Sequence, residues 1–181
     1  MMNNRKHSDD TGGPSVFVVQ SVGTVESPIT EQVPGASLPD DPAERKKELA
    51  TLRQSVRDTV ALIRVRPEYA SLLDGIDAFS HIVVLFWPHK LGEEQRRREK
   101  VHPRGLKDLP RQGIFATRSP ARPNPVLVST VELVKRQGPV LQVRGLEAFD
   151  NTPVIDIKPV VRPDDGLENF RVPDWVGQVL G

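Results

Sequence analysis

The sequence predicts a β-rich domain, either a small barrel or an open sandwich, with one clear helix. Six or seven segments are rich in β-branched and aromatic residues and are separated by turns that contain Gly or Pro. These strand-like segments do not alternate with helical ones, which argues against a doubly wound parallel sheet. With 181 residues, 37% of them apolar and 27% charged, the chain has the size and composition of one globular domain with a buried core.

The first strand and the helix are predicted in the first third of the chain. Residues 15–25, "SVFVVQSVGTV", are rich in β-branched residues and predict a strand. The polar stretch 1–14 is expected to be a disordered leader, because it lacks the apolar core of a signal peptide. The helix, at about 41–57, has Asp41 as its expected N-cap and Pro42 in its first turn. Its apolar stripe consists of Leu49, Leu52 and Val56.

Two strands are predicted in the middle of the chain. Residues 59–67 alternate between an apolar face and a face that carries arginines. Residues 79–87 are apolar on both faces, which predicts a central, buried strand. His81 inside that strand is expected to be a satisfied core or interface histidine. His89, just past its end and before a long loop, is a functional candidate, since sites are usually built on such loops.

The second half of the chain begins with a long polar connection over residues 90–112, a kind of loop that is usually functional or disordered. Residues 126–134 and 139–149 then predict a hairpin that turns at Gln137-Gly138. Residues 152–161 predict the last strand. Its alternation separates one set of side chains, Val154, Asp156 and Lys158, from a second set, Ile155 and Ile157.

The composition excludes several kinds of site. Because the chain has no cysteine, it cannot form a disulfide, a thiolate zinc site or a cysteine nucleophile. It contains neither GxGxxG nor GxxxxGK[ST], so neither a dinucleotide fold nor a P-loop is indicated. No apolar run reaches the roughly 18 residues that a membrane-spanning helix needs, and a cytoplasmic protein with no membrane partner is expected.

Charge is unevenly distributed, although the net charge is only +1. Residues 90–122 carry ten Lys or Arg against four Asp or Glu, and residues 147–174 carry seven acidic against three basic residues. A basic segment of this kind attracts polyanions such as nucleic acids, but a solvated surface loop has the same composition. The charge pattern is therefore consistent with both interpretations.

The stretch 116–125, "ATRSPARPNP", places three prolines and two arginines between strand-like segments. Prolines exclude it from a helix interior and from a central strand, so it must be a stiff loop. Arg118 and Arg122 could present guanidinium groups to a carboxylate, a phosphate or a base, beside the polar Asn124. Equally, the two arginines could pair with the acidic C-terminal part of the chain.

Asp156 and Lys158 form a second candidate group. On one face of a strand they lie about 7 Å apart, which is near enough for a loose ion pair. A charged pair in so apolar a strand indicates either a structural bridge or burial near a site. The pattern alone slightly favours the bridge.

Three blocks of the sequence together resemble the TsaA-like (TrmO) family: "DGIDAFSHIVVLFWPHK", "GIFATRSPARPNPVLVSTVELV" and "DNTPVIDIKPVV". They stand in the family's order at similar spacing, and the resemblance covers residues 15–165 as one domain. It implies a mainly β fold, an antiparallel β-barrel with one helical insertion at about 41–57. It also implies a homodimer that binds S-adenosyl-L-methionine (SAM), with the cofactor site near the interface.

The activity that the resemblance implies is a SAM-dependent tRNA methyltransferase. The methyl group would go to the exocyclic nitrogen of threonylcarbamoyl-adenosine next to the anticodon, and the basic segment 90–122 would face the anticodon loop. The alternative is a SAM- or nucleotide-binding sensor, or partner-binding module, that transfers no methyl group. A purely structural RNA-binding barrel is a third possibility.

The resemblance also implies which residues form the site. The cofactor-binding positions would be His89, Lys90, Arg118, Val128, Arg144, Gly145, Leu146 and Glu147. Positions that shape the site or meet the substrate would be Arg122, Asn124, Asp150 and Thr152. The catalytic residues would be Asp156 and Lys158, with the Asp156 carboxylate as acceptor of the proton that leaves the amine. No metal is expected.

The sequence departs from the family pattern in four places. The family motif continues PNP-Ile-Gly-Leu-Ser, whereas the chain has Val126-Leu127-Val128-Ser129, so a side chain stands where the backbone was bare. The family's DGTP turn has Asn151 in place of glycine, and asparagine still tolerates positive φ. The N-terminal Pro-Arg-Gln-x-Gly segment is not recognisable, and the helix at 41–57 occupies that region. Residues 166–181 are expected to be a tail without the additional C-terminal domain of longer members.

Overall fold

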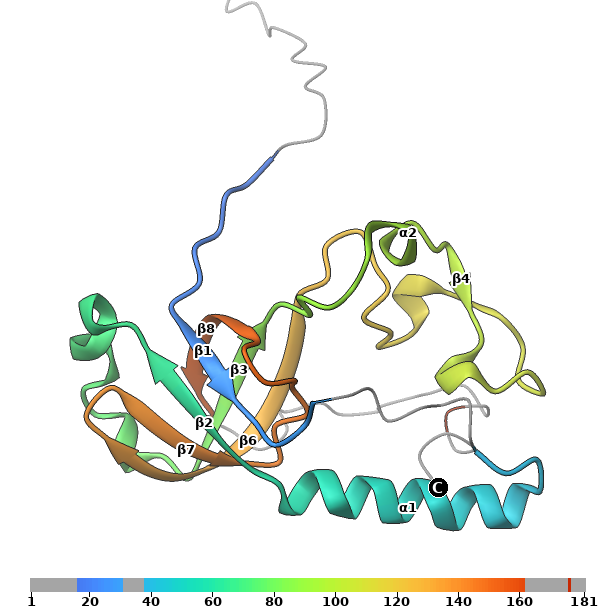
Figure 1. Ribbon diagram of the computed structural model, residues 1–181, viewed down its shortest axis with the longest axis horizontal. Coiled ribbons are helices and arrows are strands. Elements are labelled where there is room, and N and C mark those ends of the chain that lie inside the picture. The colour runs from blue at the N-terminus through green and yellow to red at the C-terminus, as the bar shows by residue number, and fades with distance from the viewer. Residues whose placement is uncertain (1–15, 31–37, 162–175, 177–181) are drawn as a thin grey trace, which may run out of the picture.

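Six antiparallel strands form a closed barrel in the order β1-β2-β7-β6-β3-β8 (Figure 1). Their bounds are β1 Gly23–Glu26, β2 Val60–Val65, β3 His81–Phe86, β6 Leu127–Gln137, β7 Val140–Arg144 and β8 Pro153–Pro159. The structure is a computed structural model that describes residues 16–30, 38–161 and 176, so the expected leader and all but one residue of the expected tail lie outside the described residues. The predicted mainly β fold with an antiparallel barrel is confirmed.

Alternating side chains fill the interior of the barrel, as the period of two along a strand requires. In β2 the inward-facing Ala61, Ile63 and Val65 are buried, as the sequence predicts. The rest of the core comes from the inner faces of the other strands, from the segment between β2 and β3 and from the loop after β7: Val25, Leu73, Ile82, Val84, Phe86, Val131, Leu141, Val143, Leu146, Ala148 and Val154.

The helix α1, Pro42–Asp58, begins where the sequence predicts it. The Asp41 carboxylate accepts hydrogen bonds from the backbone N–H groups of Ala43 and Glu44, at 3.0 and 2.9 Å, so two otherwise unpaired donors of the first turn are satisfied. Only Arg45 and Leu49 on this helix are buried. The helix is therefore a surface element whose last turn leads through Thr59 into β2.

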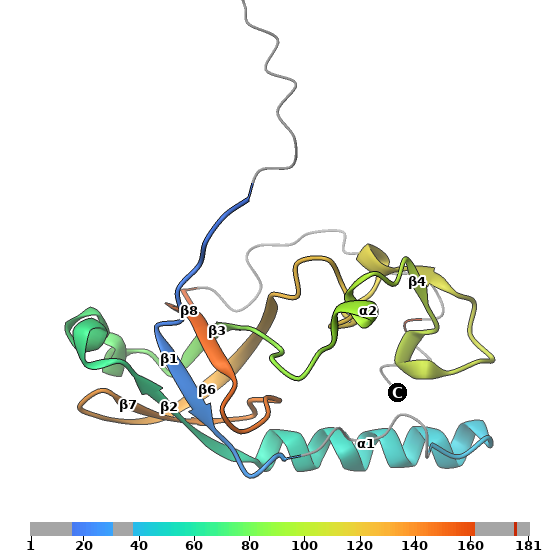
Figure 2. The same ribbon diagram turned by 45° about the horizontal axis from the view of Figure 1, so that its top comes forward.

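The connection after β3 contains more structure than a loop. It comprises the helix α2, Glu93–Arg96, the paired strands β4, Lys100–Val101, and β5, Gln112–Gly113, and the 3-10 helices η4, Pro103–Gly105, and η5, Ile114–Ala116. Leu106 and Leu109 form a small core of their own with Leu38. Figures 1 and 2 show this segment on the same side of the barrel as α1.

An ion pair joins this segment to α1. The Arg45 guanidinium donates to both carboxylate oxygens of Asp108 at 2.8 Å and to the Asp40 carbonyl at 2.8 Å. These hydrogen bonds hold the pKa of the Asp108 carboxyl below its usual range, since they stabilise the ionised form. The Arg45 side chain is only 10% exposed whereas Asp108 is 54% exposed, so a buried arginine anchors the connection through a carboxylate at the surface.

Two 3-10 helices close the end of the barrel where β3 begins and β8 ends: η2, Pro67–Leu73, and η3, Ile76–Ala78. Arg136 holds them: its guanidinium donates to the Leu73 carbonyl at 2.7 Å and pairs with Asp74 at 3.2 Å. His81 opens β3 at this end with an exposed side chain. Of the two predicted alternatives, the core histidine is therefore wrong, because the residue lies on the outer face of its strand; a position in an interface stays a prediction.

Two strand predictions need correction. The strand predicted over residues 15–25 is restricted to β1, since β2 and β8 pair only with residues 23–26. β-branched composition gave residues 16–19 a strand propensity, yet their side chains are exposed and no described strand lies beside them.

The second correction concerns the faces of β8. Leu85 pairs with Asp156 but Phe86 pairs with Val154, so Ile155 is the extra residue of a β-bulge. The bulge resets the alternation, and Val154 points into the core while Asp156 points outward. The predicted hairpin is confirmed, with Gln137 paired to Val140 across a turn that includes Gly138 at φ 58°.

Gly23 stands where β1 approaches β2 too closely for a side chain. A Cβ at this position would lie 2.4 Å from the Arg64 carbonyl oxygen, a backbone atom that cannot move alone. We expect Gly23→Ala to lower the free energy of unfolding by about 1–3 kcal/mol, measured by urea denaturation, because the two strands must separate.

Gly113→Ala is the matched control for this substitution. A Cβ at Gly113 meets nothing within 4 Å, and its φ of −56° suits any residue. The free energy of unfolding should then change by less than about 0.5 kcal/mol. Equal destabilisation by the two alanines would contradict the close approach at Gly23.

Candidate functional site

One end of the barrel gathers most of the residues that the sequence singles out. Because neighbouring strands are antiparallel, β1, β3 and β7 end where β2, β6 and β8 begin. The connections at this end are residues 27–30, 87–92, 114–126 and 145–152. We call this the loop end of the barrel; it brings together segments that are far apart in the sequence.

His89 and Thr152 meet at the loop end. The Thr152 hydroxyl oxygen and His89 Nδ1 lie 3.3 Å apart, within hydrogen-bond distance. Thr152 is buried, whereas His89 is exposed, so the threonine contacts the Nδ1 edge of an imidazole that is otherwise open to solvent. The backbone N–H of Trp87 donates to the Pro153 carbonyl at 3.0 Å and holds the two segments together.

Lys90 links two connections of the loop end. Its ammonium group donates to the Thr30 carbonyl at 2.7 Å and lies 4.7 Å from the centre of the Phe149 ring. Asp150 makes a second link, because its carboxylate accepts from the backbone N–H of Ser27 at 3.1 Å. Both predicted site residues therefore brace the loops around the barrel end.

The chain keeps a turn at residues 150–153, where the family motif reads DGTP. Asn151 adopts φ 63°, as expected for an asparagine that takes the place of a glycine, and its side-chain amide donates to Asp150 at 2.8 Å. Its backbone N–H donates to the Val25 carbonyl at 2.8 Å. The substitution of asparagine for glycine is therefore accommodated without loss of the turn.

Residues 144–147 leave β7 at the loop end in different environments. The Arg144 guanidinium donates to the Glu132 carboxylate at 3.0 Å on the outer face of β6 and β7. Gly145 adopts φ 88°, and its N–H donates to the Thr59 carbonyl at 2.9 Å. Leu146 is fully buried in the core, so it can offer a ligand only its backbone. The Glu147 side chain is exposed.

The loop 116–125 is held in shape by one of its own arginines. The Arg122 guanidinium donates to the carbonyls of Ser119 at 2.9 Å, Thr117 at 2.6 Å and Ile114 at 3.4 Å. Among the described residues, Arg122 makes these contacts to carbonyls and no ion pair with an acidic side chain. Arg118 and Asn124 instead lie exposed on the loop that Arg122 braces.

Val128, Asp156 and Lys158 lie outside the loop end, on the outer surface of the barrel. Asp156 pairs with Leu85 on one side of β3, and Val128 pairs with Leu85 on the other, so Asp156, Leu85 and Val128 stand in one row across the three strands. Lys158 pairs with Val83, in the next outward-facing row. Val128 is 56% exposed. The Asp156 carboxylate forms an ion pair with the Lys158 ammonium, as the sequence predicts, and also accepts from the backbone N–H of Ile157 at 2.9 Å.

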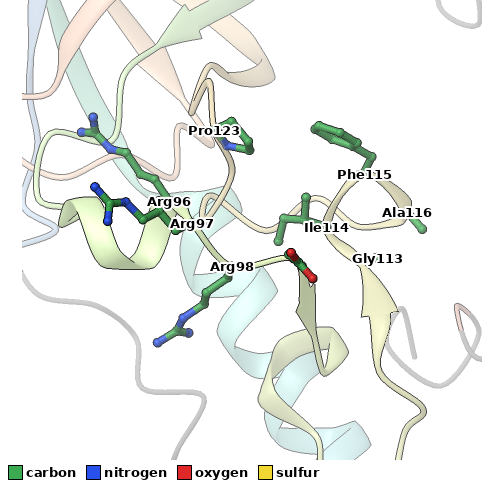
Figure 3. A pocket seen from close by; sticks show the side chains of 9 residues that line it. Arg96, Arg97, Arg98, Gly113, Ile114, Phe115, Ala116 and Pro123 are labelled. Carbon is green, nitrogen blue, oxygen red and sulfur yellow. The ribbon is translucent and has the colours of Figure 1, made fainter.

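The sequence by itself does not single out a hollow of about 350 Å³ next to the loop 116–125 (Figure 3). Three consecutive arginines, Arg96, Arg97 and Arg98, line one side, and Phe115 lines the other with Pro123 at the rim. The Arg96 guanidinium lies 5.2 Å from the centre of the Trp87 ring. The arginine run is visible in the sequence as charge, but its position opposite Phe115 depends on tertiary structure.

Two classes of site find no support in the described part of the chain. No group of three or more His, Asp or Glu side chains among the described residues is placed to hold a metal ion. In addition, none of the helices formed by those residues is both long and apolar enough to cross a membrane.

The fold and the sequence have known relatives. The family "tRNA-methyltransferase O N-terminal domain" matches residues 42–166. The chain belongs to this TrmO family. A "Probable S-adenosyl-L-methionine-binding protein" of Methanothermobacter thermautotrophicus is 48% identical over 105 residues, which are 58% of this chain and 72% of that protein.

Two further relatives extend this comparison. The "tRNA (adenine(37)-N6)-methyltransferase" of Mus musculus is 38% identical over 106 residues, which are 59% of this chain and 24% of the mouse protein. A crystal structure of TrmO superposes with a TM-score of 0.61 at 25% identity, over 87% of this chain and 64% of that one. This TrmO-family chain therefore spans less than two thirds of the solved chain and about a quarter of the mouse enzyme.

Removal of the Arg122 guanidinium should loosen the loop 116–125. We expect Arg122→Ala to leave the partly buried Thr117 carbonyl without a donor and to cost about 1–3 kcal/mol of local stability. Hydrogen exchange of residues 114–125 should accelerate by roughly ten- to a hundred-fold. Arg118→Ala, an exposed neighbour, is the control and should leave the exchange rates unchanged. Unchanged exchange in both variants would show that Arg122 does not brace the loop.

Proposed function

We propose that the protein is a SAM-dependent tRNA methyltransferase that acts on the exocyclic nitrogen of adenosine next to the anticodon, in its threonylcarbamoyl form. Membership of the TrmO family carries this proposal. The name of the mouse relative, an adenine(37)-N6 methyltransferase, gives the position and the nitrogen. A cytoplasmic location, where tRNA is available, is part of the same proposal.

The loop end offers groups that suit SAM. The cofactor has an amino-acid end with a carboxylate and an ammonium group, and a ribose with two hydroxyl groups. Arg118 is an exposed cation for the carboxylate, and Glu147 is an exposed acceptor for hydroxyl or ammonium groups. His89 and the backbone around Gly145 and Leu146 complete the proposed cofactor site. When bound, SAM supplies a methyl group made electrophilic by its sulfonium.

The protein's own residues then position the nucleophile and accept its proton. An adenine amine is a weak nucleophile, so alignment with the methyl carbon is expected to supply much of the rate. The amine proton must leave, and the proposed acceptor is Asp156, with Lys158 holding the carboxylate in place through their ion pair. Asp156 pairs with Leu85, one residue before the end of β3, so its carboxylate lies on the outer surface at the border of the loop end. Arg122, Asn124, Asp150 and Thr152 shape the loops around the site. In particular, Thr152 orients His89.

A SAM-binding protein without transfer is the second candidate. The name of the Methanothermobacter relative speaks of binding alone. In addition, Leu127 replaces the glycine of the family's Ile-Gly-Leu, which places a side chain where family members have a bare backbone. This candidate predicts cofactor binding with no methylated product.

The two candidates separate in one experiment. Labelled SAM is incubated with total tRNA from a strain that lacks the gene, followed by nucleoside analysis, while calorimetry measures SAM binding. We expect methylated threonylcarbamoyl-adenosine from the wild type. Asp156→Asn should lower kcat by about 10²–10⁴-fold with unchanged SAM affinity, and Arg118→Ala should weaken SAM binding by about ten-fold or more.

Binding of SAM without a methylated nucleoside would favour the second candidate. Absence of SAM binding would contradict both candidates. Lys135→Ala is a suitable control for both measurements, because Lys135 is an exposed cation near the hairpin turn at the other end of the barrel.

We also propose a homodimer that pairs through the outer face of β3 and β6, next to the cofactor site. Val83, Leu85 and Val128 form an apolar row there, and Val128 is 56% exposed. Asp156 and Lys158 flank the row with charges, which suits the polar rim of an interface.

Sedimentation equilibrium tests this interface. Val128→Lys should weaken dimerisation by about ten-fold or more, because an unpaired charge would be buried. Leu72→Lys is the control, since Leu72 is 76% exposed on η2 at the opposite end of the barrel. A wild type that sediments as a monomer, or equal effects of the two lysines, would contradict the proposed interface.

A further inference from the structure

The hollow beside the loop 116–125 has two chemically different walls. Figure 3 shows the Phe115 ring on one side and, on the other, Arg96 and Arg97, whose guanidinium groups extend away from the ring. Pro123 and the acidic Glu99 also line the hollow. Its volume is about 350 Å³. Pockets that hold small ligands begin at about 300 Å³, so the hollow is large enough for one nucleotide-sized group but not for a peptide segment.

The arginine wall has charge available for a ligand. Arg97 and Arg98 are exposed, and no ion pair with an acidic side chain is found for either among the described residues. Arg96 is stacked on Trp87. Its Nε is buried and has no hydrogen-bond partner among the described residues. The two exposed guanidinium groups of Arg97 and Arg98 suit a phosphate, which accepts from several donors at once and would bind on the side away from the Glu99 carboxylate.

The aromatic wall is an exposed ring on a backbone turn that hydrogen bonds hold in shape. Phe115 is 81% exposed, and its neighbour Ile114 is buried and donates its N–H to the Glu99 carbonyl at 2.8 Å. Thr117 closes η5 with a backbone hydrogen bond to the Ile114 carbonyl at 3.2 Å. A large aromatic side chain held in water by a braced turn is a stacking platform of the kind that binds unpaired bases.

We propose that this hollow takes one unpaired nucleotide of the tRNA anticodon loop, with its base on Phe115 and its phosphate at Arg97 and Arg98. The inference rests on the proposed function for the identity of the RNA. A paired base has no free face for the ring, so the hollow selects a loop over a duplex. Trp87, which contacts Arg96, stands two residues before His89, so this nucleotide lies beside the proposed cofactor site.

The test measures RNA affinity apart from methyl transfer. The probe is a fluorescently labelled RNA hairpin with an anticodon-like loop, and the comparison probe is its stem as a blunt duplex, both with the full-length chain. Phe115→Ala should weaken hairpin binding by about five- to a hundred-fold, while Phe115→Tyr keeps most of the affinity. Arg98→Gln should also lower the salt dependence of log K by about 0.7 for each phosphate that the variant no longer neutralises.

The matched controls are Leu72→Ala, another exposed apolar side chain, and Lys135→Ala, another exposed cation, both outside the hollow. Neither should change hairpin affinity by more than about two-fold, as expected for surface positions away from the bound RNA. Circular dichroism melting of each variant verifies that it is folded, and SAM affinity of Phe115→Ala, measured by calorimetry, should equal that of the wild type.

The outcomes separate this inference from the proposed function. If Phe115→Ala loses hairpin affinity but neither the wild type nor any variant forms methylated nucleoside, the nucleotide site in the hollow is supported and the proposed function is contradicted. If Phe115→Ala binds the hairpin and methylates tRNA like the wild type, the hollow does not bind the unpaired nucleotide, and the proposed function is supported. Equal affinity for hairpin and duplex, or a change in sedimenting mass on removal of the ring, would also overturn the inference.

Discussion

Closure of the barrel between β1 and β8 is the constraint on which the rest of the structure depends. Only two residue pairs, Gly23 with Val154 and Thr24 with Pro153, join these strands. The closure requires β1 to lie against β2 at a distance that leaves no room for a Cβ at position 23. In a closed barrel in which every pair of neighbouring strands is antiparallel, all connections lie at two ends. The loops that carry most of the candidate site residues lie at one of these ends.

Two cations of the loop end are bound to backbone carbonyls and not to carboxylates. Lys90 and Arg122 donate to backbone carbonyls, which orders the loops but does not neutralise the cations. The ion pairs Arg144–Glu132 and Lys158–Asp156 lie instead on the outer surface of the barrel. A surface with uncompensated cations attracts polyanions over a distance of about one Debye length, roughly 10 Å at 0.1 M salt.

The segment between β3 and β6 extends this surface beyond the barrel. It has a small core of its own, and its bidentate contact between Arg45 and Asp108 fixes it to α1. The hollow between Arg97 and Phe115 is thereby held at a set position relative to the loop 116–125. The connection would hold a nucleotide bound in the hollow, and the barrel would hold a methyl donor at the loop end. Fixed relative positions of the two lower the entropic cost of their alignment.

By itself, the sequence determined the features that depend on near neighbours. The N-cap of α1 at Asp41, the turn at Gly138, the positive φ at Asn151 and the stiff loop 116–125 all follow from local backbone chemistry. Tertiary structure decided which of the predicted site residues come together. It also shortened the first strand, since a strand needs a partner for its backbone hydrogen bonds. It turned Val154 inward, because a bulge opposite Phe86 resets the alternation, and it placed Phe115 across from three arginines distant in the chain. Pairing and close packing join residues far apart in the sequence, and no local pattern records which ones will meet.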